Sequence, residues 1–224
     1  MVDVDLAAGT LHRGQPIRTA GEPLRSAHLA MLMMHGRGAR AADILTLVDR
    51  LSQPGFAYLA PEAASNTWYP NRFLAPLESN EPWLSSALEL AAQTLAQINQ
   101  AGIPNERVML LGFSQGACLT LEFAARNATR YGGIVGLTGA LIGPEDMRRA
   151  YPGSLEGTPV FLGCSDVDIH VSKERVEDSA DILRSLGGEV TERFYPNLDH
   201  SVNNDEIEFV RGMMRNLLAA SGSR

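Results

Sequence analysis

One serine in this chain stands where a nucleophile would be exposed at the end of a buried strand. Residues 108–112 are apolar and predict that strand, and residues 117–125 predict a helix soon after it. Between them, Gly112, Ser114 and Gly116 form the pattern G-x-S-x-G, in which the serine occupies a sharp, strained turn. The glycines let neighbouring backbone pack closely, and the free N–H groups at the helix start favour negative charge. The pattern therefore predicts a nucleophilic serine rather than an ordinary strand-turn-helix corner.

A serine hydroxyl becomes a good nucleophile only when a base removes its proton, and an acid must orient that base. His200 follows a predicted strand and a short turn, so its side chain could reach the end of a sheet. Asp166 and Asp168 follow another predicted strand, and the order serine, acid, histidine is the one that this type of turn uses. Either carboxylate could accept the Nδ1–H of His200, so the residue types leave both open. We interpret His170, on the same loop, as lining the pocket or packing the loop.

The tetrahedral intermediate of acyl transfer needs two hydrogen-bond donors for its oxygen anion. We expect these donors to be the backbone N–H of Gln115, at the helix start, and the backbone N–H of Arg37. Arg37 belongs to the run His-Gly-Arg-Gly at 35–38, which could alone be a plain turn but here follows a predicted strand and precedes the serine motif. His35 in this run is a candidate substrate contact. The Arg37 side chain could bind an anionic substrate group or stay in solvent.

The segment 62–80 shows no clear periodicity and predicts a long surface loop. Long loops in compact domains are often functional. Trp68 and Tyr69 in this loop could line an acyl or alcohol pocket, or they could anchor the loop onto the body of the protein. The sequence leaves both interpretations open.

Strands alternate with helices along most of the chain. The predicted strands cover 29–34, 56–60, 108–112, 133–137, 160–164 and 190–195, and the predicted helices cover 41–51, 82–101, 117–125, 172–186 and 202–218. Residues 10–28 are polar and interrupted by glycine and proline, which suggests short antiparallel edge strands. This alternation predicts an α/β fold with a mainly parallel central sheet and helices on both faces. We expect one domain over residues 1–224, since 138–159 is too short for a separate lid domain.

Composition excludes several classes of partner. The 224-residue chain carries a formal net charge of −7, which argues against nucleic acid or an anionic membrane surface as the main partner. The N-terminal residues lack the pattern of a secretory signal, and no apolar run reaches the roughly 20 residues that span a bilayer. Two cysteines are too few for a disulfide framework or a zinc site. The expectation is a cytoplasmic protein without stable membrane association.

The motifs resemble those of the phospholipase/carboxylesterase family of the α/β-hydrolase superfamily, whose members include acyl-protein thioesterases. Residues 35–38 are similar to the family's His-Gly-x-Gly loop, and residues 112–116 match its nucleophile motif. Residues 168–171 are similar to its Asp-Pro-His-Val stretch, with Ile169 in place of the proline. That register implies Asp168 as the acid. The resemblance covers most of the chain and implies an α/β-hydrolase fold that cleaves carboxylic esters or thioesters without a metal or organic cofactor.

These inferences combine into one hypothesis. Ser114, Asp168 and His200 form a catalytic triad that hydrolyses a small-molecule ester through an acyl-enzyme, and the open site favours short-chain or small aromatic esters. The same residues would equally serve a thioesterase, a lysophospholipase or a dienelactone-hydrolase-like enzyme. A hydrolase-fold protein that only binds a ligand is the alternative outside enzymes. The chain could also form a homodimer.

Overall fold

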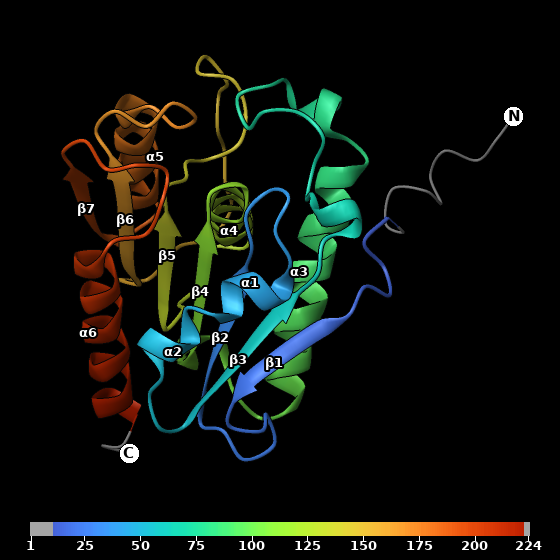
Figure 1. The fold of residues 1–224 in the computed structure, drawn as a ribbon, viewed down its shortest axis with the longest axis vertical. Coiled ribbons are helices and arrows are strands. Elements are labelled where there is room, and N and C mark those ends of the chain that lie inside the picture. Colours follow the sequence, from blue (N-terminus) through green and yellow to red (C-terminus); the bar gives the residue numbers. More distant parts are fainter. Residues whose placement is uncertain (1–10, 222–224) are drawn as a thin grey trace, which may run out of the picture.

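A single seven-stranded sheet organises the computed structural model, which describes residues 11–221 (Figure 1). The strand order is β1-β3-β2-β4-β5-β6-β7. β1 pairs antiparallel with β3, and all other neighbouring strands are parallel. The strands are β1 (Ile17–Gly21), β2 (Leu29–Met34), β3 (Phe56–Pro61), β4 (Val108–Phe113), β5 (Gly133–Leu137), β6 (Pro159–Ser165) and β7 (Glu189–Tyr195). The predicted mainly parallel sheet is confirmed.

Helices cover both faces of this sheet. They are α1 (Ala41–Leu45), α2 (Val48–Leu51), α3 (Trp83–Gln100), α4 (Gln115–Arg126), α5 (Lys173–Ser185) and α6 (Asn204–Ser221). Successive side chains of a strand point to opposite faces, and β2 shows the result: Leu32 packs in the core with residues of α3, α4 and α5, whereas Met33 packs with residues of α1, α2 and α6. The expected two-sided arrangement is confirmed.

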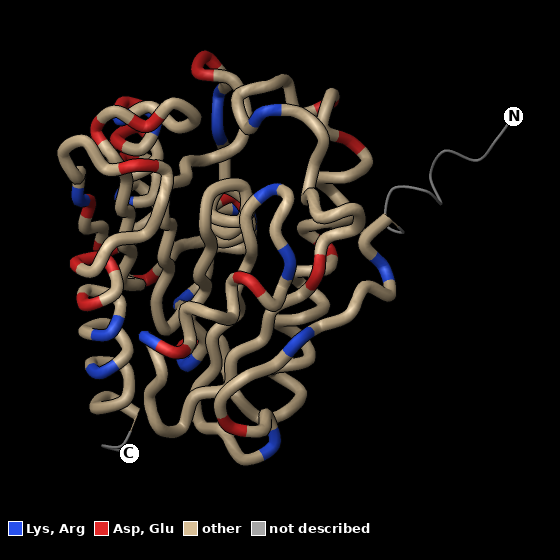
Figure 2. The backbone as a smooth tube through the Cα atoms, in the orientation of Figure 1, with Lys and Arg blue, Asp and Glu red and all other residues tan. Residues whose placement is uncertain are grey.

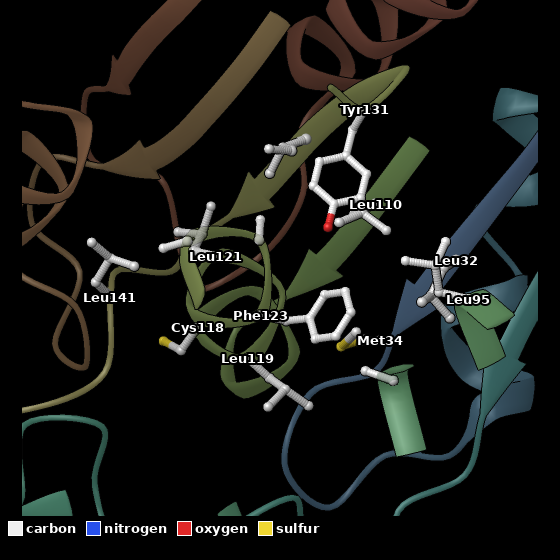
Figure 3. Close-up of a cluster of buried hydrophobic side chains, with 14 of the residues drawn as sticks. Leu32, Met34, Leu95, Leu110, Cys118, Leu119, Leu121, Phe123, Tyr131 and Leu141 are labelled. Carbon is white, nitrogen blue, oxygen red and sulfur yellow. The ribbon is translucent and has the colours of Figure 1, made fainter. Parts of the chain in front are cut away.

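Helix α4 lies at the centre of the first of these cores. Every residue from Gln115 to Ala125 is buried. Figure 3 shows Leu119, Leu121 and Phe123 spreading from this helix into different parts of the core. Such a helix cannot shift without disturbing the packing on several sides, so its N-terminus is a rigid support for the serine that precedes it.

Two segments differ from the sequence-based expectation. The helix predicted over 41–51 is divided into α1 and α2, because Thr46 donates its hydroxyl to the Asp43 carbonyl at 2.7 Å and its N–H to the same oxygen, which competes with regular helical bonding. The polar segment before β2 contributes a single strand, β1, within the described residues. The loop predicted over 62–80 contains two short 3₁₀ turns, Ala64–Asn66 and Leu77–Asn80, and a third, Asn105–Arg107, precedes β4.

The parallel strands bring separate parts of the sequence to one edge of the sheet. β2 and β4 are neighbours in the sheet, β5 separates β4 from β6, and β7 lies next to β6. Their carboxyl ends lie together at the upper edge in Figure 1, so the segments that follow them meet there. Acidic and basic positions are interspersed over the described chain (Figure 2). Among residues 11–221, none of the helices combines the length and apolar character needed to cross a bilayer.

Candidate active site

Ser114 occupies the turn between β4 and α4 with an unusual backbone conformation. Its φ of 54° and ψ of −120° lie where a residue with a side chain is strained. The Ser114 N–H donates to the Leu137 carbonyl on β5 at 2.9 Å, and the Ser114 carbonyl accepts from the Cys118 N–H at 3.0 Å. The neighbouring strand and the first turn of α4 therefore fix a conformation that places the hydroxyl at the sheet edge.

Three side chains from distant parts of the sequence form one hydrogen-bonded chain. Ser114 Oγ lies 2.8 Å from His200 Nε2, and His200 Nδ1 lies 2.7 Å from Asp168 Oδ2. Because an ionised carboxylate only accepts hydrogen bonds, Nδ1 carries the imidazole proton and Nε2 is free to accept the serine proton. The geometry is that of a nucleophile, its base and an acid that orients the base.

Both oxygens of the Asp168 carboxylate accept hydrogen bonds. Its side chain is fully buried, and Oδ1 accepts the backbone N–H groups of His170 at 2.8 Å and Val171 at 2.9 Å. Burial alone would raise the pKa of Asp168, but the hydrogen bonds from His200 and these two N–H groups outweigh it and lower the pKa below the ordinary value. Asp168 is therefore ionised at neutral pH.

The structure separates the two carboxylates that the sequence left open. Asp166 is exposed, and its Oδ1 accepts the backbone N–H of Asn197 at 2.9 Å, in the turn that follows β7. Asp168 makes the bond to His200. Asp166 thus stabilises the loop before His200 rather than the imidazole itself.

Two aromatic rings flank the imidazole of His200. The Phe113 ring lies 5.3 Å from it between centroids, and the His170 ring lies 4.9 Å away in an edge-on arrangement. His170 also lines the adjacent cavity, as one interpretation of the sequence expected. The two rings limit how far the imidazole can swing away from Ser114.

The two backbone groups expected to bind the oxyanion belong to segments that adjoin Ser114. Gln115 is the first residue of α4, and the N–H at that position has no carbonyl one turn earlier to bond. The loop at Gly36 packs so closely that a Cβ there would lie 3.5 Å from the Cβ of Ser114. A hydrogen bond of 2.7 Å from the Gly38 N–H to the Asn66 carbonyl holds this loop in place. Arg37 follows Gly36 directly in this loop, and the binding of the oxyanion by its N–H stays a prediction.

The side chains of the same two residues bind the loop that follows β3. Gln115 Oε1 accepts the Trp68 N–H at 3.0 Å, and Gln115 Nε2 donates to the Tyr69 carbonyl at 2.7 Å. The Arg37 guanidinium donates to the carbonyls of Pro70 at 2.8 Å and Asn71 at 2.5 Å. The Arg37 side chain thus supports this loop, a use that the sequence did not indicate.

The expected substrate contacts divide into two groups. His35 and Trp68 are buried and do not line the cavity: the Trp68 indole donates to the His35 carbonyl at 2.8 Å, and the two rings pack at 4.8 Å. They anchor the loop, and direct contact with substrate stays a prediction for both. Tyr69 is also buried, but it does line the cavity.

A cavity of about 540 Å³ lies against Ser114 and His200. This volume is in the range of sites for small molecules. Within residues 11–221, no group of three His, Cys, Asp or Glu side chains is placed to hold a metal ion. The cavity is lined by Arg37, Tyr69, Pro70, Asn71, Arg72, Phe73, Ser114, Gln115, Cys118, His170, Val171 and His200.

Glu206, which no sequence motif singled out, supports the segment that carries His200. It is fully buried, its Oε2 accepts the Asn203 N–H at 2.8 Å, and its own N–H donates to Asn203 Oδ1 at 3.0 Å. This reciprocal pair is a capping box at the start of α6, and the pattern Asn-x-x-Glu could have indicated it. Burial, with Asp205 nearby, raises the pKa of Glu206 to about 7, although the Asn203 hydrogen bond opposes the shift.

The chain is similar to known proteins in both sequence and structure. The model of the family described as Phospholipase/Carboxylesterase matches residues 20–218. The crystal structure of a phospholipase/carboxylesterase from Dyadobacter fermentans is 43% identical, superposes with a TM-score of 0.87, and the match covers 89% of this chain and 96% of that one. This likeness confirms the expected α/β-hydrolase fold.

Among curated sequences, the matches include acyl-protein thioesterases 1 from fungi. The protein of Yarrowia lipolytica is 27% identical over 208 residues, which cover 83% of this chain and 90% of the relative. The protein of Gibberella zeae is 33% identical over 121 residues, which cover 53% of this chain and 51% of the relative. The chain spans about half the length of the first two curated relatives it matches.

Proposed function

Because the chain belongs to the phospholipase/carboxylesterase family, we propose that it is a serine hydrolase that cleaves carboxylic esters or thioesters through an acyl-enzyme on Ser114. The observation that carries this proposal is the continuous hydrogen-bond chain from Ser114 through His200 to Asp168, which opens onto a cavity of about 540 Å³. A protein that only binds a ligand has no need for this alignment.

In the first half-reaction, Ser114 Oγ attacks the carbonyl carbon of the substrate while His200 Nε2 takes the hydroxyl proton. Asp168 remains ionised and stabilises the imidazolium that forms. The negative charge on the carbonyl oxygen is held by the backbone N–H groups of Arg37 and Gln115. When the tetrahedral intermediate collapses, His200 returns the proton to the departing alcohol or thiol, and the acyl group stays on Ser114.

In the second half-reaction, a water molecule takes the place of the departed group. His200 accepts a proton from the water, the hydroxide attacks the acyl carbon, and the same two N–H groups hold the oxyanion. The proton then passes to Ser114 Oγ as the carboxylic acid leaves. This cycle needs no cofactor.

The cavity favours small substrates. Its volume and its contact with Tyr69, Phe73 and Val171 suit a short-chain or small aromatic ester better than a large lipid. Thioesters are the second candidate class, because relatives named acyl-protein thioesterase match this chain. A panel of short esters, acyl thioesters, lactones and lysolipids, ranked by kcat/KM, distinguishes the esterase from the thioesterase, dienelactone-hydrolase-like and lysophospholipase alternatives.

Replacing the nucleophile tests the proposal directly. Ser114→Ala should lower the turnover of p-nitrophenyl acetate by at least about 10³-fold and abolish labelling by a fluorophosphonate probe, with an unchanged circular dichroism spectrum. Ser185→Ala is the matched control, since Ser185 is exposed on α5 and bonds only the Ile182 carbonyl. Undiminished turnover by Ser114→Ala, or no labelling of the wild type, would contradict the proposal. Cytoplasmic location and a homodimer stay predictions, the latter open to light scattering.

A further inference from the structure

His12 is buried against the loop that follows β3, although it lies far from that loop in the sequence. Its side chain is inaccessible to solvent, Nδ1 accepts the Ala64 N–H at 2.9 Å, and Nε2 donates to the Trp68 carbonyl at 3.0 Å. The His12 N–H donates to Ser86 Oγ on α3 at 2.9 Å, which fixes the backbone that carries the ring. These contacts require a neutral imidazole, because an imidazolium has no acceptor nitrogen.

His35 holds the neighbouring residue of the same loop in the same way. It is also inaccessible to solvent, Nε2 accepts the Ala63 N–H at 3.1 Å, and Nδ1 donates to the Gly36 carbonyl at 2.8 Å. The rings of His12 and His35 lie 5.7 Å and 4.8 Å from the Trp68 ring. Two neutral histidines thus take up two consecutive backbone N–H groups and enclose one tryptophan.

The loop held by these histidines is the one that contacts both candidate oxyanion residues. Further along this loop, Trp68 and Tyr69 bond the side chain of Gln115, and the Pro70 carbonyl accepts from Arg37. The Trp68 indole also bonds the His35 carbonyl, one residue before Gly36. Loosening the loop would therefore remove the contacts that the side chains of both residues make with it.

Protonation would turn the acceptor nitrogen of each ring into a donor. An imidazolium at position 12 or 35 would point a donor at the N–H group of Ala64 or Ala63 and place a charge in a site without solvent. Burial lowers the pKa of both histidines, and the charge of His35 lowers the pKa of His12 further. The carboxylates that act on His35 are Glu62 and Asp43, and both favour its protonated form. Acid is the condition under which the contacts fail.

We propose that His12 and His35 form a proton-sensitive latch, which holds the loop 62–71 against the residues that bind the oxyanion and releases it when the rings gain protons. His12 acts here as a positioning residue. It lies before residue 20, where the family match begins, so this half of the latch comes from outside the matched region. The catalytic part of the inference rests on the proposed function, whereas the latch itself does not.

Tryptophan fluorescence observes the latch without any substrate. The chain has two tryptophans, Trp68 and Trp83, and the His12 ring lies 5.7 Å and 5.5 Å from them. Titrating the wild type from pH 8 to pH 4.5 should change the emission before far-UV circular dichroism changes. His12→Gln, which stays neutral and keeps a donor and an acceptor, should reduce that change and leave only the part that His35 causes. His28→Gln, at an exposed histidine, should leave it intact.

Kinetics connects the latch to catalysis. Towards acid, kcat of the wild type for p-nitrophenyl acetate should fall more steeply than a single protonation allows, and His12→Gln should make that fall shallower by one proton with KM unchanged. His12→Phe, which keeps the packing but loses both hydrogen bonds, should lower kcat at least tenfold at pH 7.5. A purely structural role would lower the melting temperature and leave the shape of the pH profile unaltered.

Tryptophan emission tests the latch, and hydrolysis tests the proposed function, so either result can be negative without the other. An emission that stays constant down to the onset of unfolding, or that titrates identically in His12→Gln, overturns the latch whatever the enzyme hydrolyses. An absence of hydrolysis in the wild type would contradict the proposed function and leave the fluorescence result decisive. If His12→Gln does not fold, NMR titration of the five histidines in the wild type decides: the latch requires that the rings of His12 and His35 gain protons only at a lower pH than an ordinary imidazole, and ordinary titration of both these rings overturns it.

Discussion

Asp168 accepts hydrogen bonds from His200 and from two backbone N–H groups at once. An amide at this position could present either its oxygen or its NH₂ to the imidazole, and the NH₂ would favour the tautomer whose Nε2 cannot accept the serine proton. We therefore predict that Asp168→Asn lowers kcat by about 10³ to 10⁴-fold, measured with p-nitrophenyl acetate at pH 7.5.

The neighbouring carboxylate supplies the control for that experiment. Asp166→Asn removes a charge from the same loop but keeps an oxygen for the Asn197 N–H, so kcat should change by less than about tenfold. Equal losses in the two variants would contradict the assignment of the acid to position 168.

Glu206 gives the fold a dependence on pH. Its folded pKa of about 7 exceeds the ordinary value of 4.5, so the folded state binds the proton more tightly than the unfolded state does. This contribution is complete below pH 4.5 and is lost as the pH rises through 7, and it amounts to about 3 kcal/mol. Glu206→Gln is always neutral and keeps the oxygen that caps Asn203.

Urea unfolding at pH 5.5 and pH 8.5 measures the effect. The wild type should lose stability between the two values, and Glu206→Gln should lose about 2 kcal/mol less, because the unfolded carboxyl is already largely ionised at pH 5.5. An identical pH dependence in both proteins would show that the Glu206 carboxyl does not titrate there.

Residues differ in how far the sequence reveals them. The pattern around Ser114 is local, because the turn, the glycines and the helix start are contiguous, and so the expected strand-turn-helix geometry could be predicted. The choice between Asp166 and Asp168 depends on the path of a loop, and the residues alone left it open until the family resemblance supplied a register. His12 carries no local signal, since its partners lie more than fifty residues away.

At the level of elements, the junction of β2, β4 and α4 decides whether the serine turn can form. A Cβ on Gly116 would overlap the Met34 carbonyl at the end of β2, a backbone atom that cannot move aside. We predict that Gly116→Ala costs about 3 kcal/mol of folding free energy and reduces hydrolysis, measured by urea unfolding and p-nitrophenyl acetate turnover.

Gly212 in α6 is the matched position. It is also helical, and the nearest atom to an added Cβ is the end of the Arg215 side chain at 3.9 Å. Gly212→Ala should therefore raise stability by up to about 1 kcal/mol through helix propensity. If both substitutions behaved alike, close packing would not be the reason for glycine at position 116.

Elements with a strong hydrophobic pattern were predictable to within a residue or two. Strand β5 and the extended run of β2 match their expected bounds, because both are buried on two faces. The interruption between α1 and α2 depends on one threonine hydroxyl that bonds the backbone, and hydrophobic periodicity does not register such a bond. The loop 62–80 is fixed by contacts with Arg37, Gln115 and two histidines, all distant in sequence.

On the scale of the whole molecule, the two cores share the same strands. Leu32 and Met33 are adjacent in β2 and belong to opposite cores, so neither core can separate without the sheet. We propose that the chain is a single domain and predict one cooperative transition in urea, with coincident midpoints by tryptophan fluorescence and far-UV circular dichroism. Two resolved midpoints would contradict a single domain.

The position of His12 relative to the family match has a practical consequence for anyone who shortens this protein. A version trimmed to residues 20–218 would retain Ser114, Asp168 and His200. It would lack β1 up to Thr19 and the ring that Ala64 and Trp68 contact. Screening such a trimmed version for hydrolysis would underestimate the activity of the full chain. Recombinant versions should therefore begin before His12, so that its ring is kept against the loop beside the site.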